Sequence, residues 1–243
     1  ERGLNSRFLA VLFAVCCLAA SLGMGNMVQG NSMAKGLETA FSIPPFLTGT
    51  ICMILVAIIS AGGVKRIASL TVKLVPFMAG IYFLGALAVL AINWQAVPGA
   101  VKLIFTQAFQ LKAGAGGIAG YTMGQAVRMG IARGIFSNEA GLGSSVMAHA
   151  QTDVQSPEIQ GMWGILEVFI DTIVGCTVTA LVILTSGVYQ PELYLKQISQ
   201  GIETIDGTTL TGQAFAAVIT WGEQSLAAAT ALFAFATIAG WSY

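Results

Sequence analysis

Long apolar segments alternate with short polar ones along the whole chain. Six apolar segments are long enough to cross a membrane, for which about 20 residues are needed. They lie at about residues 8–34, 41–63, 74–97, 119–150, 161–188 and 224–243. The polar stretch 191–212 predicts an outer loop, followed by a short amphipathic segment at 214–221. The pattern predicts an all-α polytopic membrane protein in which residues 1–243 form a single transmembrane domain.

The composition supports a membrane protein and argues against other classes. Apolar residues make up 56% of the chain and charged residues 9%, whereas soluble domains carry about 25% charged residues. The net charge is zero and no basic cluster is present, which gives no indication of nucleic-acid binding. The chain starts at Glu1 without a methionine and stops at Tyr243 inside an apolar run. We therefore expect it to be an internal portion of a longer protein.

The segment 130–145 combines apolar neighbours with an arginine, an asparagine, a glutamate and four glycines. Glycines on both sides of its centre favour a helix that breaks and restarts. Ser137 or Asn138 is expected to cap the restarted half. A broken helix at membrane depth is tolerated where it lines a cavity, and transporters use such breaks to bind an anionic group and a cation. An ordinary turn between two helices is the alternative.

Polar residues also interrupt two other membrane segments. Asn26, Gln29 and Gly30 share one face of the first segment, which suits either a ligand or helix–helix hydrogen bonding. Glu167 and Asp171 are one helical turn apart in the fifth segment. They form a proton or cation relay, or they pair structurally with Arg128 or Arg133, and we favour the pairing. Glu139, in the first turn of the restarted helix, is expected to pair with one of these arginines or with a cation.

The distribution of lysine and arginine gives an orientation. Placing the basic stretch 65–73 in the cytoplasm puts five basic residues there and four on the opposite side. The bias is small, but it makes the chain start inside, and it makes the segment with the break run from outside to inside.

Signatures of an enzyme are absent from the sequence. His149 is the only histidine, so an HExxH zinc helix is impossible. The glycine-rich stretches are not followed by the Lys-Ser/Thr of a phosphate loop, and Ser144-Ser145 have no partner base in the sequence. We therefore expect a protein that is not an enzyme and has no cofactor, and we interpret His149 as a packing residue.

Several long strings resemble one family of transporters. They are Gly130–Ala150, Gln160–Gly164 leading into Glu167–Thr172, Gly25–Gln29, and the terminal Gly240–Tyr243. Together they resemble the alanine or glycine:cation symporter family, and the resemblance covers essentially the whole chain. It implies the fold of the leucine transporter, built from two five-helix inverted repeats. This chain would then supply the third to eighth helices, with the break in the sixth, and would lack the first broken helix.

The resemblance also implies a function and a set of site residues. The family takes up alanine or glycine together with sodium, sometimes with protons, by alternating access around a mid-membrane site in the cell membrane. The substrate would be bound by Gly25, Asn26, Gln29, Phe136, Ser137, Asn138 and Gly141, and sodium by Thr237 and Asn138. Sodium would be the coupling ion, and the lipid bilayer and the amino acid would be the partners. The alternatives are an ion channel or ion-translocating subunit lined by Glu139, Glu167 and Asp171, and a scaffold subunit.

Overall fold

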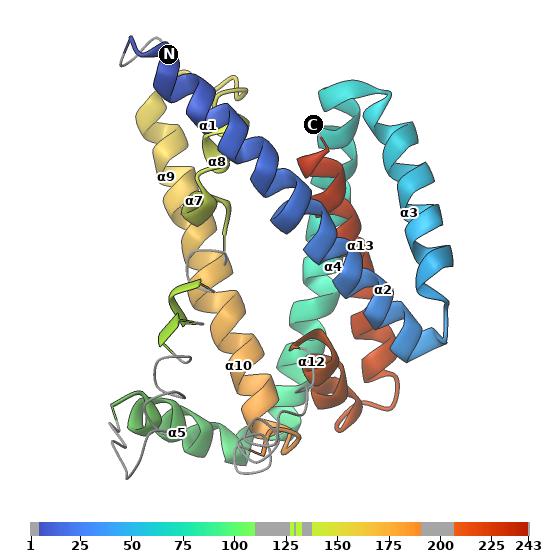
Figure 1. Cartoon of the computed structure of the whole chain (residues 1–243). Helices are drawn as coiled ribbons and strands as arrows, with labels where there is room; N and C mark the ends of the chain where they lie inside the picture. Colours follow the sequence, from blue (N-terminus) through green and yellow to red (C-terminus); the bar gives the residue numbers. More distant parts are fainter. Residues whose placement is uncertain (1–4, 110–126, 129, 133–137, 191–206, 243) are drawn as a thin grey trace, which may run out of the picture. The chain divides into compact units, whose positions relative to one another are not determined.

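A computed structural model describes residues 5–109, 127–128, 130–132, 138–190 and 207–242. All regular structure in this part of the chain is helical (Figure 1). The helices are α1 (Arg7–Ala20), η1 (Ser21–Met27), α2 (Val28–Phe41), α3 (Pro45–Ser60), α4 (Gly63–Ile92), η2 (Trp94–Ala96), α5 (Val97–Phe109), α7 (Glu139–Leu142), α8 (Ser145–His149), α9 (Pro157–Val168), η3 (Phe169–Gly175), α10 (Cys176–Thr185), α12 (Gly207–Ala216) and α13 (Gly222–Trp241).

Four of these helical stretches are long and apolar enough to cross a membrane. They are Arg7–Phe41, Gly63–Ile92, Pro157–Thr185 and Gly222–Trp241. The helix α3 is also apolar but shorter, and it starts at Pro45, where proline costs a helix little because the first N–H groups have no helical partner. The described residues therefore form an all-helical protein with several candidate membrane spans.

The helix α4 differs from the expected segment 74–97. It begins at Gly63 and ends at Ile92, so the basic residues Lys65 and Arg66 belong to its first turns and not to a loop. Lysine and arginine are good helix formers, and at the end of a membrane helix their charged groups reach water. A charged stretch at the membrane surface can therefore continue a helix.

The chain divides into two compact units, which we describe separately. The first unit comprises Glu1–Trp94 and Val182–Tyr243, and the second comprises Gln95–Leu181. The α13 helix lies at the centre of the first unit, where it packs against α2, α3, α4, α12 and η1 (Figure 1). Its buried residues are mostly alanines, and such small side chains let neighbouring membrane helices approach closely.

Phe215 of α12 joins three helices of the first unit. Its ring lies 6.0 Å from the ring of Tyr82 on α4, centroid to centroid. A Cβ atom built on Gly85 would be 2.9 Å from the same ring, and one built on Gly222 would overlap the Phe215 carbonyl oxygen. The two glycines therefore allow α12 to sit against α4 and against the start of α13.

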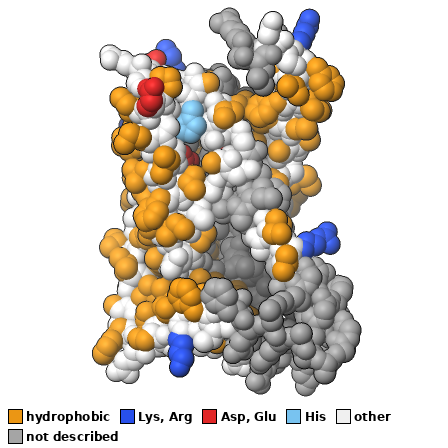
Figure 2. Space-filling model, turned by 90° about the vertical axis from the view of Figure 1, so that its left-hand side faces the viewer, with side chains coloured by type: hydrophobic (Ala, Val, Ile, Leu, Met, Phe, Trp, Pro, Cys, Tyr) orange, Lys and Arg blue, Asp and Glu red, His pale blue; other side chains and the backbone are white. Residues whose placement is uncertain are grey.

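Many large apolar side chains point outward. Phe8, Phe46 and Leu84 are each more than 70% exposed. On the face that Figure 2 shows, hydrophobic side chains cover much of the described surface and only a few charged ones interrupt it. A surface of this kind suits contact with lipid, which solvates apolar side chains as well as a protein core does.

Two of the long helices contain a π-helical segment. The first, Ser21–Met27, joins α1 to α2, and the second, Phe169–Gly175, joins α9 to α10. In a π turn the N–H bonds to the carbonyl five residues back, as Val28 N–H does with the carbonyl of Gly23. Both segments coincide with polar residues of the sequence, namely Asn26 in the first and Asp171 and Thr172 in the second.

Candidate functional site

The continuous helix Arg7–Phe41, made of α1, η1 and α2, is called the first helix below. Gly25 lies buried in its π segment, directly against the side chain of Trp241 on α13. A Cβ atom at Gly25 would be 2.5 Å from both Cγ and Cδ2 of the indole. The missing side chain therefore makes room for the tryptophan. Gly25 was predicted to line the substrate site, and its observed neighbour is this indole ring.

The first helix and α13 form an antiparallel pair, as their contacts along the chain indicate (Figure 1). Gly25 contacts Trp241, Met33 shares a buried cluster with Ala234, and Gly36 lines a small cavity with Ala227. Gln29 lies midway between Gly25 and Met33, and Thr237 lies between Trp241 and Ala234. Two residues expected from the sequence to act in binding, Gln29 and Thr237, therefore occupy one level of this pair.

Three polar side chains, those of Asn26, Gln29 and Thr237, lie within about one helical turn of this level along their helices. The Asn26 side-chain oxygen Oδ1 is buried and accepts no hydrogen bond. No described residue hydrogen-bonds to the half-buried Gln29 side chain. The Thr237 hydroxyl donates to the Phe233 carbonyl at 2.9 Å, which leaves its oxygen lone pairs available as acceptors. A buried polar atom without a partner costs about 1–3 kcal/mol, so these groups suit a bound polar ligand or ion.

In the second unit, Asn138 is the N-cap of the short helix α7. Its side-chain oxygen accepts from the Gly141 N–H at 2.8 Å, which confirms the predicted cap at Asn138, while the predicted break before it lies outside the described residues. The other end of the same side chain, Nδ2, donates to the Thr172 hydroxyl at 2.9 Å. Asn138 therefore ties the start of α7 to the π segment Phe169–Gly175.

Glu139, the first residue of α7, is bonded to a residue just after this helix. The Ser144 hydroxyl donates to the Glu139 carboxylate. Gly143, which ends α7, has φ of 80°, a left-handed conformation that glycine adopts without a steric penalty. The sequence predicted an ion pair of Glu139 with Arg128, Arg133 or a cation; Arg133 lies outside the described residues, and the ion pair stays a prediction.

His149 at the end of α8 packs against α9. Its Nδ1 is hydrogen-bonded to the Gln160 side chain, and a Cβ atom at Gly164 would be 3.6 Å from its Nε2. The ring thus lies between α8 and α9, in the packing role that the sequence suggested. Glu167 and Asp171 lie farther along the same helix, Asp171 within its π segment.

Some of the predicted residues lie outside the described part of the chain. They are Phe136, Ser137 and Arg133. Gly141, which was expected to bound the substrate, is exposed and donates to the Asn138 cap. Among the described residues no group of three His, Cys, Asp or Glu side chains could hold a metal ion.

Two residues of these sites were not singled out by sequence reasoning, namely Trp241 and Thr172. Trp241 was quoted only as part of a family string, and a tryptophan near the end of a membrane segment is usually interpreted as an interfacial anchor. Thr172 directly follows Asp171, whose charge drew the attention. A search for small hydroxyl residues beside an intramembrane carboxylate would have found it.

The family comparison agrees with the membrane helices. The family model described as the sodium:alanine symporter family matches residues 1–243. The sodium/alanine symporter AgcS of Methanococcus maripaludis is 37% identical over 243 residues, which are 100% of this chain and 51% of that protein. The putative sodium/proton-dependent alanine carrier protein YrbD of Bacillus subtilis is 38% identical, over 100% of this chain and 50% of that protein. The probable sodium/glutamine symporter GlnT of the same species is 34% identical, over 99% and 47%.

The chain spans about half the length of the curated relatives that it matches. Their names differ in the amino acid, alanine for two of them and glutamine for the third.

Proposed function

This chain belongs to the sodium:alanine symporter family and is part of a multi-pass protein of the cell membrane, and from that premise we propose its activity. The proposed activity is secondary active uptake of a small neutral amino acid, alanine or glycine, coupled to sodium. Transport follows alternating access in a fold like that of the leucine transporter. No cofactor is needed, because the sodium gradient supplies the driving force.

The proposal rests on the polar side chains of the first helix and α13 at the level where Gln29 and Thr237 lie. Asn26 offers a buried oxygen without a partner, and Gln29 offers an amide without a hydrogen bond to any described residue. Polar groups left unpaired within a membrane are costly, and they mark ligand and ion paths more often than scaffolds. A zwitterionic amino acid suits them, because its ammonium donates hydrogen bonds to an amide oxygen.

Sodium suits the hydroxyl at the same level. The Thr237 oxygen keeps lone pairs beyond the bond that it donates to Phe233. Hard cations prefer oxygen ligands of this kind. We therefore keep Thr237 as a sodium ligand in the proposal, and Asn138 of the second unit as a residue for substrate or sodium.

The remaining assignments rest on the family resemblance. Phe136 and Gly141 would limit the size of the substrate side chain, and Ser137 would offer a hydroxyl or backbone group. Gly25 would act indirectly, since the absence of a side chain admits Trp241. A relative named for glutamine indicates that the size limit varies within the family.

The test is accumulation of labelled alanine by the full-length protein in proteoliposomes. An inward sodium gradient should drive alanine above its equilibrium level, and replacing sodium with potassium outside should abolish the accumulation. Unlabelled glycine should compete, and glutamine should compete less. Alanine or sodium flux that stops at equilibrium would indicate the alternative, a channel, because a channel cannot concentrate its substrate. Absence of any alanine flux would refute the substrate class.

A further inference from the structure

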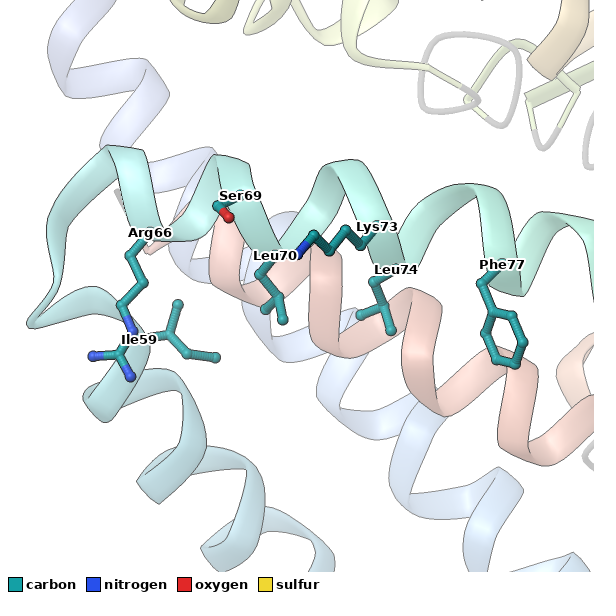
Figure 3. Close-up of a pocket in the computed structure, with 7 residues that line it drawn as sticks. All are labelled: Ile59, Arg66, Ser69, Leu70, Lys73, Leu74 and Phe77. Atoms are coloured by element: carbon teal, nitrogen blue, oxygen red, sulfur yellow. The ribbon is translucent and has the colours of Figure 1, made fainter.

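An open groove of about 440 Å³ lies on the first turns of α4, beside the end of α3. Arg66, Ser69 and Lys73 form a polar stripe along it, and Leu70, Leu74 and Phe77 form an apolar one (Figure 3). Residues three, four and seven apart share a face of a helix, so each stripe is continuous along α4. We propose that this groove binds an anionic phospholipid, with the phosphate on the polar stripe and an acyl chain on the apolar one.

The level of the groove in the membrane fits a phospholipid. Trp94 lies just after the end of α4, and tryptophan is enriched at the membrane–water interface. About 20 helical residues cross the hydrocarbon, and counted back from Trp94 they reach residue 74. Lys73 then lies at the boundary of the hydrocarbon, and Arg66 lies about 10 Å farther out, at a rise of 1.5 Å per residue. The phosphate of a lipid lies between these two depths.

The shapes of the two cationic side chains support the same placement of the phosphate. The Lys73 side chain runs back along α4 toward Leu70, so its ammonium points to the outer side of the boundary (Figure 3). One N–H of Arg66 donates to the Ile58 carbonyl at the end of α3, at 3.1 Å. This bond holds the guanidinium at the groove while its other N–H groups remain as donors for a phosphate.

Gly62 supports the position of Arg66. A Cβ atom at Gly62 would overlap the Arg66 Cδ, so the arginine stem lies across this glycine. None of the described residues that line the groove is acidic. Within the described part of the chain, neither Arg66 nor Lys73 forms an ion pair, so their charge is left for a ligand.

The charge of the groove decides which lipid it takes. Two cations and a hydroxyl favour a lipid with net negative charge over a zwitterionic one, whose amine they would repel. The distribution of lysine and arginine along the sequence predicts that this end of α4 faces the cytoplasm. Anionic lipids of the cytoplasmic leaflet attract basic residues near the membrane. Leu74 and Phe77 continue from the cations toward the hydrocarbon and distinguish a lipid from a free phosphate ion, which has no apolar part.

The test measures lipid retained by the full-length protein after purification from mixed phosphatidylglycerol and phosphatidylcholine, by native mass spectrometry. The wild type should retain phosphatidylglycerol in preference to phosphatidylcholine. Arg66→Gln and Lys73→Gln should each lower the retained phosphatidylglycerol about ten-fold or more, because each removes a charge-assisted hydrogen bond to the phosphate. Lys65→Gln, a matched change of an exposed lysine outside the groove, should have less than a two-fold effect.

Two further arms separate a bound lipid from a free anion and from diffuse attraction. Phe77→Ala should lower retention, whereas millimolar inorganic phosphate should not displace the lipid. Displacement by phosphate, or no effect of Phe77→Ala, would show a site for a free anion and overturn the proposal. An equal loss in Lys65→Gln and Lys73→Gln would show diffuse attraction and overturn it too. If the glutamine variants fail to fold, the comparison of Lys73→Arg with Phe77→Ala tests the proposal instead. Lys73→Arg keeps the charge and should retain phosphatidylglycerol, whereas Phe77→Ala should lose it.

Discussion

Gly25 allows a sharp test of how the first helix meets α13. In Gly25→Ala the new methyl group would be 2.5 Å from two ring carbons of Trp241. Carbon atoms in contact are normally about 3.5–4.0 Å apart, so the indole or the whole helix has to move by about 1 Å. Overpacking of this kind typically costs about 1–3 kcal/mol.

The matched control is Gly23→Ala in the same π segment. A Cβ atom at Gly23 meets nothing within 4 Å, and alanine is the better helix former by about 1 kcal/mol. We therefore expect Gly23→Ala to be neutral or slightly stabilising, although the two substitutions are chemically identical and two residues apart.

The assay is the thermal midpoint of the purified full-length protein, monitored by gel filtration of heated samples. Sodium-dependent alanine uptake is measured in parallel. Gly25→Ala should lower the midpoint by a few degrees, at about 1–2 °C per kcal/mol, because the relatives are about twice as long as this chain and the entropy of unfolding scales with length. In the Trp241→Ala background the additional loss caused by Gly25→Ala should vanish, because the clash partner is gone. Equal effects of Gly23→Ala and Gly25→Ala, or an undiminished loss in the Trp241→Ala background, would refute the packing argument.

Three further predictions concern the binding residues. Gln29→Ala should raise the apparent alanine constant of uptake with little loss of folded protein, and a loss of folded protein with normal transport by the remainder would indicate a packing role instead. Thr237→Val should raise the sodium concentration needed for half-maximal uptake, whereas Thr237→Ser, which keeps the oxygen, should leave it within about two-fold; equal effects of both would exclude Thr237 as a ligand. Asn138→Ala should cost about 0.5–2 kcal/mol through loss of the N-cap, measured by the thermal midpoint, and its effect should be less than additive with Thr172→Val because the two share a hydrogen bond.

The sequence predicted those parts of the structure that follow from local chemistry. A long apolar stretch predicts a membrane helix, because backbone N–H and C=O groups in lipid must bond to one another. Asn138 could be expected as a cap because a short amide side chain accepts from free N–H groups, and it does so toward Gly141. Pro45 at the start of α3 follows from the same local rules.

Contacts between distant segments could not be predicted in this way. Nothing near Gly25 in the sequence indicates that Trp241 covers it, because that contact depends on how α13 runs past the first helix. The polar stretch before residue 212 predicted a loop, yet α12 starts at Gly207. Its weak helix formers are supported by packing, in which Phe215 contacts α4 and α13. Tertiary contacts override propensity at such places.

The π segments show that a glycine-rich pattern does not reveal every distorted segment of a membrane helix. A break leaves free N–H and carbonyl groups, so it requires caps such as Asn138 and left-handed glycines such as Gly143, which are visible in a sequence. A π turn keeps the backbone paired within the helix and needs neither. The first helix therefore widens at Asn26 without any cap signature, and its distortion appears only in the structure. Such turns occur frequently at functional sites, and both π segments coincide with polar residues, so unbroken helices are candidates for binding as well.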